Sequence, residues 1–493
     1  MELRDRSALN ERPLHELHRR RMAKEIRTVE IAEAVLKRVD AVEPKVKAYI
    51  TLTTEGVLER ARTADKRIEK GQPLSPIDGM PLAIKDIFQT QGVRTTCGSK
   101  ILEDFVPPYD ATVVARLKAA GLNLVGKANM DEFAMGSSTE NSAYGPTHNP
   151  WDLSRVPGGT SGGSAAAVAA GECIAAIGTD TGGSIRQPAA FTSVVGLKPT
   201  YGRVSRYGMA AFASSLDQGG PMTRDVRDAA ILLNLMAGHD SRDSTSAPVP
   251  VPDFTQALKG DLKGRRIGLV KEFEEQGHPE REVAAAFAAN LRTLQDLGAQ
   301  TVAISLPSLS YAIAVYYILA PCEASSNLGR YDGVRYGLRV QDGGLLEQYL
   351  HTREQGFGPE VKRRIMLGTF ALSSGYYDAY YVRAMKIRRM LRRDFELAFA
   401  QVDLIASPVS PVPAFKLGEK LADPLQMYLI DAYTLPANLA GLPGISVPGG
   451  FTKSGLPIGL QLMAPHFAEE RLLQAAHAFE AATPFHERLP PLA

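Results

Sequence analysis

The 493-residue chain is poor in cysteine, carries almost no net charge and has no long uninterrupted apolar run. Its three cysteines, Cys97, Cys173 and Cys322, lie far apart, which excludes a disulfide framework and a thiolate zinc site. Lys and Arg number 56 against 54 Asp and Glu, so bulk charge does not indicate a nucleic-acid binder. The longest apolar candidate, residues 164–177, is too short for a membrane span and contains Glu172.

The first 21 residues are rich in Arg and Glu and contain no apolar segment of the kind that secretory signals need. Three unpaired cysteines also suit a reducing compartment. We therefore expect a cytoplasmic protein without contact to a membrane.

Alternating strand and helix patterns predict an α/β protein. Short apolar segments after turn residues predict buried strands at residues 81–84 and 122–125, and helical spacing predicts a helix over 111–120. A second strand–helix–strand unit covers residues 266–306, and residues 311–393 are largely helical. Such alternation predicts a single body, residues 1–493, with three layers (α/β/α) and a mostly parallel sheet.

Motifs for nucleotides and metals are incomplete. Residues 121–127 spell G-x-x-x-x-G-K, but Ala128 stands where a phosphate-binding loop needs Ser or Thr. His15 and His18 form an HxxH pair without the Glu of a zinc protease, and an exposed helical face is the simpler interpretation. No metal site is predicted.

A basic run lies at residues 386–393, with Lys386, Arg388, Arg389, Arg392 and Arg393. On a helix these side chains would cover most of the exposed side. A solvated face is the favoured interpretation, and contact with RNA or a partner is the alternative.

Two clusters of glycine and hydroxyl residues carry the strongest chemical signal, at residues 157–164 and 178–188. Consecutive backbone N–H groups in such turns form a nest for an anion. Thr181, Gly182, Gly183 and Ser184 could therefore supply an oxyanion hole and a hydroxyl nucleophile from one loop. The alternative is a pair of tight structural turns.

A serine nucleophile needs a base, and no histidine of the chain lies in a recognisable catalytic motif. A lysine can take this role when burial lowers its pKa and makes it neutral. Lys85 ends the apolar segment 80–84 and suits the role. An exposed lysine that pairs with Asp86 is the alternative.

Taken together, these residues resemble the amidase signature family. Residues 79–86 match GxPxxxKD, residues 158–164 match GGSSGGS with one change, and residues 178–189 match GTDxGGSIRxPA. The order agrees, as does the 24-residue step from position 160 to 184. The resemblance implies a three-layer α/β/α fold with a large mixed central sheet, and a signature core at about 75–230.

The resemblance also implies catalytic roles: Ser184 as the nucleophile, Lys85 as the base, and position 160 as the bridging hydroxyl that follows a cis peptide. The family has Ser at the bridge, whereas this chain has Thr160, which keeps the hydroxyl and adds a stiffening methyl group. Ser161 is the neighbouring alternative.

Three further stretches, residues 323–337, 358–388 and 431–443, are similar to one branch of that family, the A subunits of glutamyl-tRNA(Gln) amidotransferases. This resemblance implies a helical glutamine pocket at about 311–393 and pocket residues Tyr316, Arg364 and Asp431. Free glutamine is a zwitterion, so an arginine for its carboxylate and an aspartate for its ammonium are chemically apt. Arg363 is the neighbouring alternative to Arg364.

The resemblance implies that the chain releases ammonia from glutamine through an acyl-serine, without a cofactor of its own. Its partners would be a B subunit, which uses ATP and Mg²⁺ and makes most of the tRNA contacts, and a small C subunit, in a heterotrimer that converts glutamyl-tRNA(Gln) to glutaminyl-tRNA(Gln). The alternatives are a stand-alone amidase for a small amide and a catalytically silent scaffold subunit.

Overall fold

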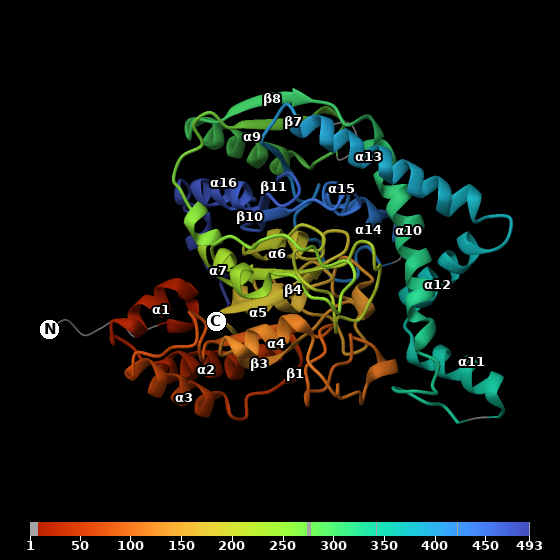
Figure 1. The fold of residues 1–493 in the computed structure, drawn as a ribbon, viewed down its shortest axis with the longest axis horizontal. Helices are drawn as coiled ribbons and strands as arrows, with labels where there is room; N and C mark the ends of the chain where they lie inside the picture. Colours follow the sequence, from red (N-terminus) through yellow and green to blue (C-terminus); the bar gives the residue numbers. More distant parts are fainter. Residues whose placement is uncertain (1–7, 274–277, 342, 422, 493) are drawn as a thin grey trace.

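In a computed structural model, which describes residues 8–273, 278–341, 343–421 and 423–492, the strands form one 11-stranded sheet (Figure 1). The order across the sheet is β1-β3-β2-β4-β6-β5-β10-β11-β9-β7-β8. In chain order the strands are β1 (Tyr49–Leu52), β2 (Pro81–Lys85), β3 (Asn123–Ala128), β4 (Ala175–Asp180), β5 (Val195–Lys198), β6 (Gln218–Thr223), β7 (Arg266–Val270), β8 (Gln300–Ile304), β9 (Leu404–Pro408), β10 (Gly444–Phe451) and β11 (Pro457–Met463).

The sheet is mixed, as the family resemblance implied, and the prediction of a mostly parallel sheet was wrong. Only the pairings β2–β3, β2–β4, β7–β8 and β7–β9 are parallel. The other pairings, which include those at the centre of the sheet, are antiparallel. The physical reason is clearest at β10 and β11: residues 452–456 between them are too few for a crossover helix, so the two strands form a hairpin.

Helices cover both faces of the sheet, because alternate strand residues point to opposite sides. Ala83 and Ala176 belong to one apolar cluster, with α2 (Thr28–Val46) and α5 (Gly162–Ala170). Ile84 and Ile177 belong to the main core, with α4 (Thr112–Ala119), α7 (Val226–Met236) and α16 (Glu469–Ala481). The outcome is the predicted three-layer α/β/α arrangement. The remaining helices of the sheet body are α1 (Leu14–Met22), α3 (Val57–Glu69), α6 (Arg186–Thr192) and α9 (Arg281–Asp296).

A group of helices extends beyond one edge of the layered body, at the right of Figure 1. It consists of α10 (Ala312–Asn327), α11 (Leu345–Gly356), α12 (Pro359–Leu372) and α13 (Arg383–Phe399). Helices α10 and α13 also contact α15 (Leu435–Ala440), which follows α14 (Pro424–Leu429). Helix α15 lies next to the loop of the predicted nucleophile Ser184, residues 181–185, which we call the nucleophile loop. Within the described residues, every helix is too short or too polar to cross a bilayer.

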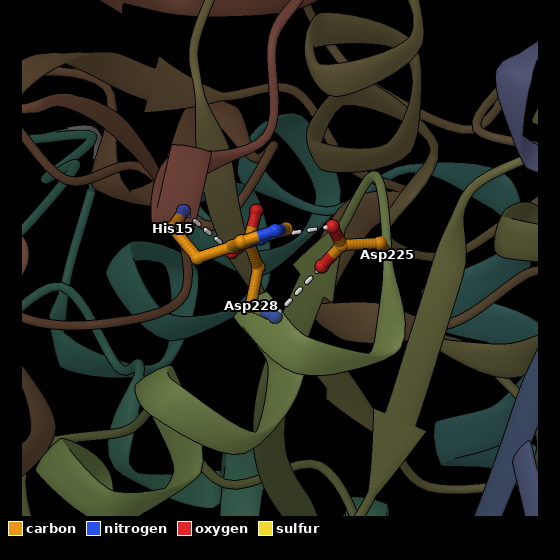
Figure 2. A group of neighbouring side chains, drawn as sticks. All are labelled: His15, Asp225 and Asp228. Carbon is orange, nitrogen blue, oxygen red and sulfur yellow. Dashed lines mark hydrogen bonds and ion pairs between the residues drawn. The ribbon is translucent and has the colours of Figure 1, made fainter. Parts of the chain in front are cut away.

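The predicted HxxH face is not simply exposed, because His15 joins the N-terminal helix α1 to α7 (Figure 2). Its Nδ1 lies 3.0 Å from Asp228 Oδ1 and 3.1 Å from Asp225 Oδ2, and Asp228 also accepts the N–H groups of Leu14 and His15. Burial alone would lower the pKa of His15, but these two carboxylates raise it to about 10. The imidazolium is the cation between the two carboxylates, so the grouping needs no metal ion.

Candidate active site

The three motifs meet at one edge of the sheet. Strands β2 and β4 are parallel neighbours, so their carboxyl ends lie side by side, with Lys85 at the end of β2 and Asp180 at the end of β4. The turn before α5 carries Thr160 and Ser161, and the loop between β4 and α6 carries Ser184. The backbone N–H of Ser161 donates to the carbonyl of Ser184 at 3.1 Å, which joins the two loops directly.

Lys85 is fully buried and faces hydroxyl groups instead of an ion-pair partner. Its Nζ lies 2.7 Å from Thr160 Oγ1, 2.9 Å from Ser161 Oγ and 2.8 Å from Thr179 Oγ1. Burial lowers the pKa of Lys85 to about 7, although nearby carboxylates, Asp131 first among them, act in the opposite direction. A large fraction of this lysine is therefore neutral near pH 7 and can accept a proton.

Of the three hydroxyls that contact the lysine, two belong to the turn before α5, and their other hydrogen bonds distinguish Thr160 from Ser161. Ser161 Oγ donates to the carbonyl of Thr179 at 3.0 Å and accepts its N–H at 3.2 Å, so its proton is already engaged. Thr160 Oγ1 has no second partner among the described residues, and the Gly159–Thr160 peptide bond is cis, as the resemblance implied. The geometry favours Thr160 as the proton carrier.

The predicted oxyanion donors are not equivalent. Gly183 donates its N–H to Asp180 Oδ1 at 2.9 Å, so this N–H is not free for an oxyanion. The N–H groups of Thr181, Gly182 and Ser184 have no such acceptor in the described part of the chain. Among the described residues no hydrogen bond joins Thr160 Oγ1 to Ser184 Oγ, so the last step of the relay remains a prediction.

Asp180 organises the nucleophile loop, a role that sequence reasoning did not assign. Its carboxylate accepts the N–H of Ile185 as well as that of Gly183, and forms a buried ion pair with Arg186 at 3.0 Å. Burial would raise the pKa of Asp180, but the charge of Arg186 holds it at about 2. The carboxylate thus stays ionised and keeps the loop in one conformation.

The nucleophile loop approaches the helical extension closely. A Cβ added to Gly182 would lie 2.7 Å from the ring of Tyr316 on α10, so only glycine fits there. Gly183 has φ +136° and would meet Thr434, whose hydroxyl donates to the carbonyl of Gly182 at 2.7 Å. Tyr316, predicted to line the pocket, thus lies directly beside the loop that bears Ser184.

Arg364 and Asp431 come from α12 and the segment before α15, and both are buried. Arg364 Nε donates to Glu360 at 2.8 Å, and its guanidinium lies over the rings of Tyr317 and Tyr428. The neighbouring Arg363 is only partly exposed and pairs with the other oxygen of Glu360, so the structure places Arg364, not Arg363, beside the pocket aromatics.

Asp431 has one strong hydrogen bond, from Ser137 Oγ at 2.7 Å, and a longer contact with Tyr317 Oη at 3.4 Å. Burial raises the pKa of Asp431 to about 7, which Arg364 only partly offsets. A buried carboxylate of this kind is stabilised in its ionised form by an added cation. The ammonium group of a ligand would supply one.

Gln187 links the turn that carries Thr160 to this pocket, and no signal in the sequence pointed to Gln187. Its Oε1 accepts the N–H of Gly159 at 2.9 Å, and its Nε2 donates to the carbonyl of Ser137 at 2.9 Å. Since Ser137 holds Asp431, a short chain of hydrogen bonds runs from the residue before Thr160 to the candidate ammonium site.

Nearly the whole chain is similar to proteins of one family. Residues 30–473 match the Amidase family. The chain is 60% identical over 478 residues to the A subunit of glutamyl-tRNA(Gln) amidotransferase from Moorella thermoacetica, and the match covers 97% of this chain and 98% of that protein.

Solved structures show the same relationship. The A subunit of glutamyl-tRNA(Gln) amidotransferase from Thermotoga maritima superposes with a TM-score of 0.82 at 42% identity, over 99% of both chains. The native peptide amidase from Stenotrophomonas maltophilia reaches the same TM-score of 0.82 at 31% identity, over 97% of this chain and 98% of that one. The backbone of this chain is therefore equally similar to both proteins, whereas its sequence identity is higher to the amidotransferase subunit.

Proposed function

This chain belongs to the amidase family, and on that premise we propose that it is the glutamine-hydrolysing A subunit of a glutamyl-tRNA(Gln) amidotransferase. Support comes from the near-complete coverage at 60% identity to a protein of that name. The single structural observation that carries the proposal is that a buried arginine, Arg364, and a buried aspartate, Asp431, both lie near the Ser184 loop. Together they offer the two charges that a free amino acid needs.

The bound substrate would be glutamine in its zwitterionic form. Its carboxylate would meet Arg364, whose terminal N–H groups have no protein acceptor among the described residues, and its ammonium would meet Asp431. The side-chain amide would then reach the Ser184 loop, where Tyr316 packs against Gly182. A neutral acyl amide would leave the terminal N–H groups of Arg364 and the carboxylate of Asp431 without these ligand partners, at a cost of about 1–3 kcal/mol for each.

The chemistry follows from the proton relay. Neutral Lys85 accepts the proton of the Thr160 hydroxyl. Thr160 in turn takes the proton of Ser184 as Ser184 Oγ attacks the amide carbon. The oxyanion is stabilised by free N–H groups of the loop at 181–184, and the C–N bond breaks as the proton returns to the leaving nitrogen. The products are ammonia and a glutamyl-Ser184 ester, which water hydrolyses to glutamate by the same relay.

We further propose that the ammonia serves a partner. In this proposal a B subunit uses ATP and Mg²⁺, makes most of the tRNA contacts and amidates glutamyl-tRNA(Gln), while a small C subunit completes a heterotrimer. The complex would work in the cytoplasm, where aminoacylated tRNA is used; the three buried free cysteines suit that compartment.

Ser184→Ala in the assembled complex tests the proposal. We expect glutamine hydrolysis to be lost, while glutaminyl-tRNA(Gln) is still formed when ammonium chloride replaces glutamine. The matched control is Ser161→Ala, which should retain much of the glutaminase activity. A wild-type protein that hydrolyses simple amides as well as glutamine, or glutamine-dependent turnover by Ser184→Ala, would contradict the proposal.

A further inference from the structure

The basic run at 386–393 lines a cavity instead of a convex, fully solvated face. The cavity has a volume of about 950 Å³ and lies between α13 and the segment that includes α15. Four arginines of α13 line it: Arg388, Arg389, Arg392 and Arg393. Arg388 and Arg392, like Arg389 and Arg393, are four residues apart, so the four side chains share one side of the helix. The sequence alone left open whether this run contacts RNA. The cavity is a structural observation that bears on this question.

Positive charge is concentrated on this helix. Helix α13 contains six Lys and Arg (RAMKIRRMLRRDFELAF) and two acidic residues, a surplus of four, whereas the whole chain has a surplus of two. Balanced composition therefore conceals a strongly basic element. A cavity with walls of one charge sign concentrates the field and attracts counter-ions.

The four arginines differ in what they bind. Arg388 is structural, because its guanidinium donates to the carbonyls of Leu439 and Ser215 and thereby fixes α13 to the body. Arg392 and Arg393 share one carboxylate, Glu396, each at 3.3 Å and each well exposed. Arg389 has no partner among the described residues. Three exposed guanidinium groups thus have one carboxylate between them.

The opposite wall adds no negative charge. It is formed by Tyr201, His466, Phe467 and the turn at Gly441, and Glu396 is the only acidic residue among the described residues that line the cavity. Burial and the charge of Arg392 lower the pKa of His466, whose Nε2 lies 2.9 Å from the carbonyl of Ala440. The cavity is thus a basic groove whose lining also includes aromatic side chains.

We propose that this cavity binds backbone phosphates of RNA, namely of the tRNA that the complex acts on; the inference rests on the proposed function. Arginine is suited to phosphate because its planar N–H groups bind two oxygens at once. Arg389 and Arg393 lie one helical turn apart on the same side of α13, so their charges form a row along the helix that suits the successive phosphates of a strand. Aromatic side chains near a basic groove favour a nucleic-acid strand over an acidic peptide.

Fluorescence anisotropy of the full chain with a labelled tRNA transcript tests this assignment. The variant Arg389→Gln/Arg392→Gln/Arg393→Gln removes the row and leaves Arg388 in place. The matched control, Arg62→Gln/Lys66→Gln/Lys70→Gln, removes three exposed charges at helical spacing from α3 and its C-cap residue, Lys70. We expect the first variant to bind about tenfold or more weakly, with a slope of log K against log salt that is shallower by about 2–3. The control should change neither quantity by more than about twofold.

Competitors identify the source of the phosphate. Unlabelled tRNA should displace the probe, whereas ATP and poly-L-glutamate should not do so at comparable charge concentration. Equal tRNA binding by the α13 variant and the wild type, displacement by ATP, or displacement by polyglutamate would each overturn the assignment. Glutaminase activity, measured without RNA, should be unchanged in both variants; its absence from the wild type would instead contradict the proposed function.

Discussion

The signature core and the helical extension build their parts of the site in different ways. In the core, Lys85, Thr160 and Ser184 come from strand ends and tight turns, all are buried, and short hydrogen bonds fix Lys85 and Thr160. In the extension, Arg364 is held mainly by Glu360 and by aromatic rings. Under the proposed function, the core would carry out the chemistry, and Arg364 of the extension would help to select the substrate. Variants in the core should lower kcat, and variants in the extension should raise KM.

The largest effect is expected for Lys85→Arg. Arginine keeps a positive charge at every ordinary pH, so it cannot accept the proton of Thr160. We expect kcat to fall by about 10³-fold or more, since loss of a general base costs about 10²–10⁴-fold and relay members act as a unit. The control is Lys198→Arg, a second buried lysine whose pKa burial lowers to about 7. Among the described residues, its Nζ donates only to the carbonyl of Pro199. Steady-state glutaminase kinetics provide the measurement. If Lys85→Arg retained most of the wild-type kcat, Lys85 would be a structural residue and not the base.

The bridging hydroxyl is tested by three variants. Thr160→Val keeps the branched shape and removes the proton carrier, so its kcat should fall by about 10²–10⁴-fold. Thr160→Ser should remain active, because the hydroxyl is kept. Ser161→Ala should be milder than Thr160→Val, because Ser161 already donates to the carbonyl of Thr179. The reverse ranking of Thr160→Val and Ser161→Ala would move the relay to Ser161.

In the extension, Arg364→Gln should raise KM for glutamine by about 10–100-fold, because a charge-assisted contact with the substrate carboxylate is lost. The kcat should change far less than in the core variants. Arg363→Gln, one residue away and partly exposed, is the matched control and should change KM by less than about twofold. Equal effects of the two substitutions on KM would remove Arg364 from the pocket.

The pH profile joins the catalytic core to the substrate pocket. Lys85 must be neutral to act as a base and Asp431 must be ionised to bind an ammonium group, and both have a pKa of about 7. As pH falls through 7, both groups become protonated, so kcat/KM should fall with the steepness of two protons. In Asp431→Asn the fall should reflect one proton, at a lower overall kcat/KM. A wild-type profile that is flat between about pH 6 and 8 would contradict both assignments.

The smallest effect lies outside both regions. His15→Ala leaves two carboxylates without their cation and should reduce the free energy of unfolding by about 1–3 kcal/mol, with kcat and KM unchanged. The pKa of His15 is raised in the folded protein, from 6.5 to about 10. Its contribution is therefore complete below about pH 6.5 and is lost as pH rises to about 10. Urea unfolding across this range should show a weaker pH dependence in the variant than in the wild type.

Sequence reasoning could predict catalytic groups because the candidates lie in short motifs at strand ends, where local spacing fixes geometry. It predicted Lys85, Thr160 and Ser184, and the structure brings their segments together. It could not foresee that Gly183 donates its N–H to Asp180. That bond depends on how the loop folds back on the end of β4, which spacing alone does not specify.

Long-range partners were also beyond the sequence. Gln187 reaches Ser137, 50 residues earlier, and His15 meets Asp228 although 213 positions separate them in the chain. Such contacts depend on tertiary packing, which leaves no periodic signal. The prediction of the strand directions failed for a related reason. Alternation of strands and helices indicates the layers, whereas the length of each connection distinguishes a crossover from a hairpin.

Mass spectrometry of the acid-quenched enzyme during turnover of glutamine tests the relay most directly. A peptide that contains Ser184 should gain the mass of one glutamyl group as an ester on that serine. The gain should be absent in Ser184→Ala and strongly reduced in Thr160→Val, but present in Thr160→Ser. A glutamyl group on any other residue, or full acylation of Ser184 in Thr160→Val, would contradict the proposed Lys85–Thr160–Ser184 mechanism.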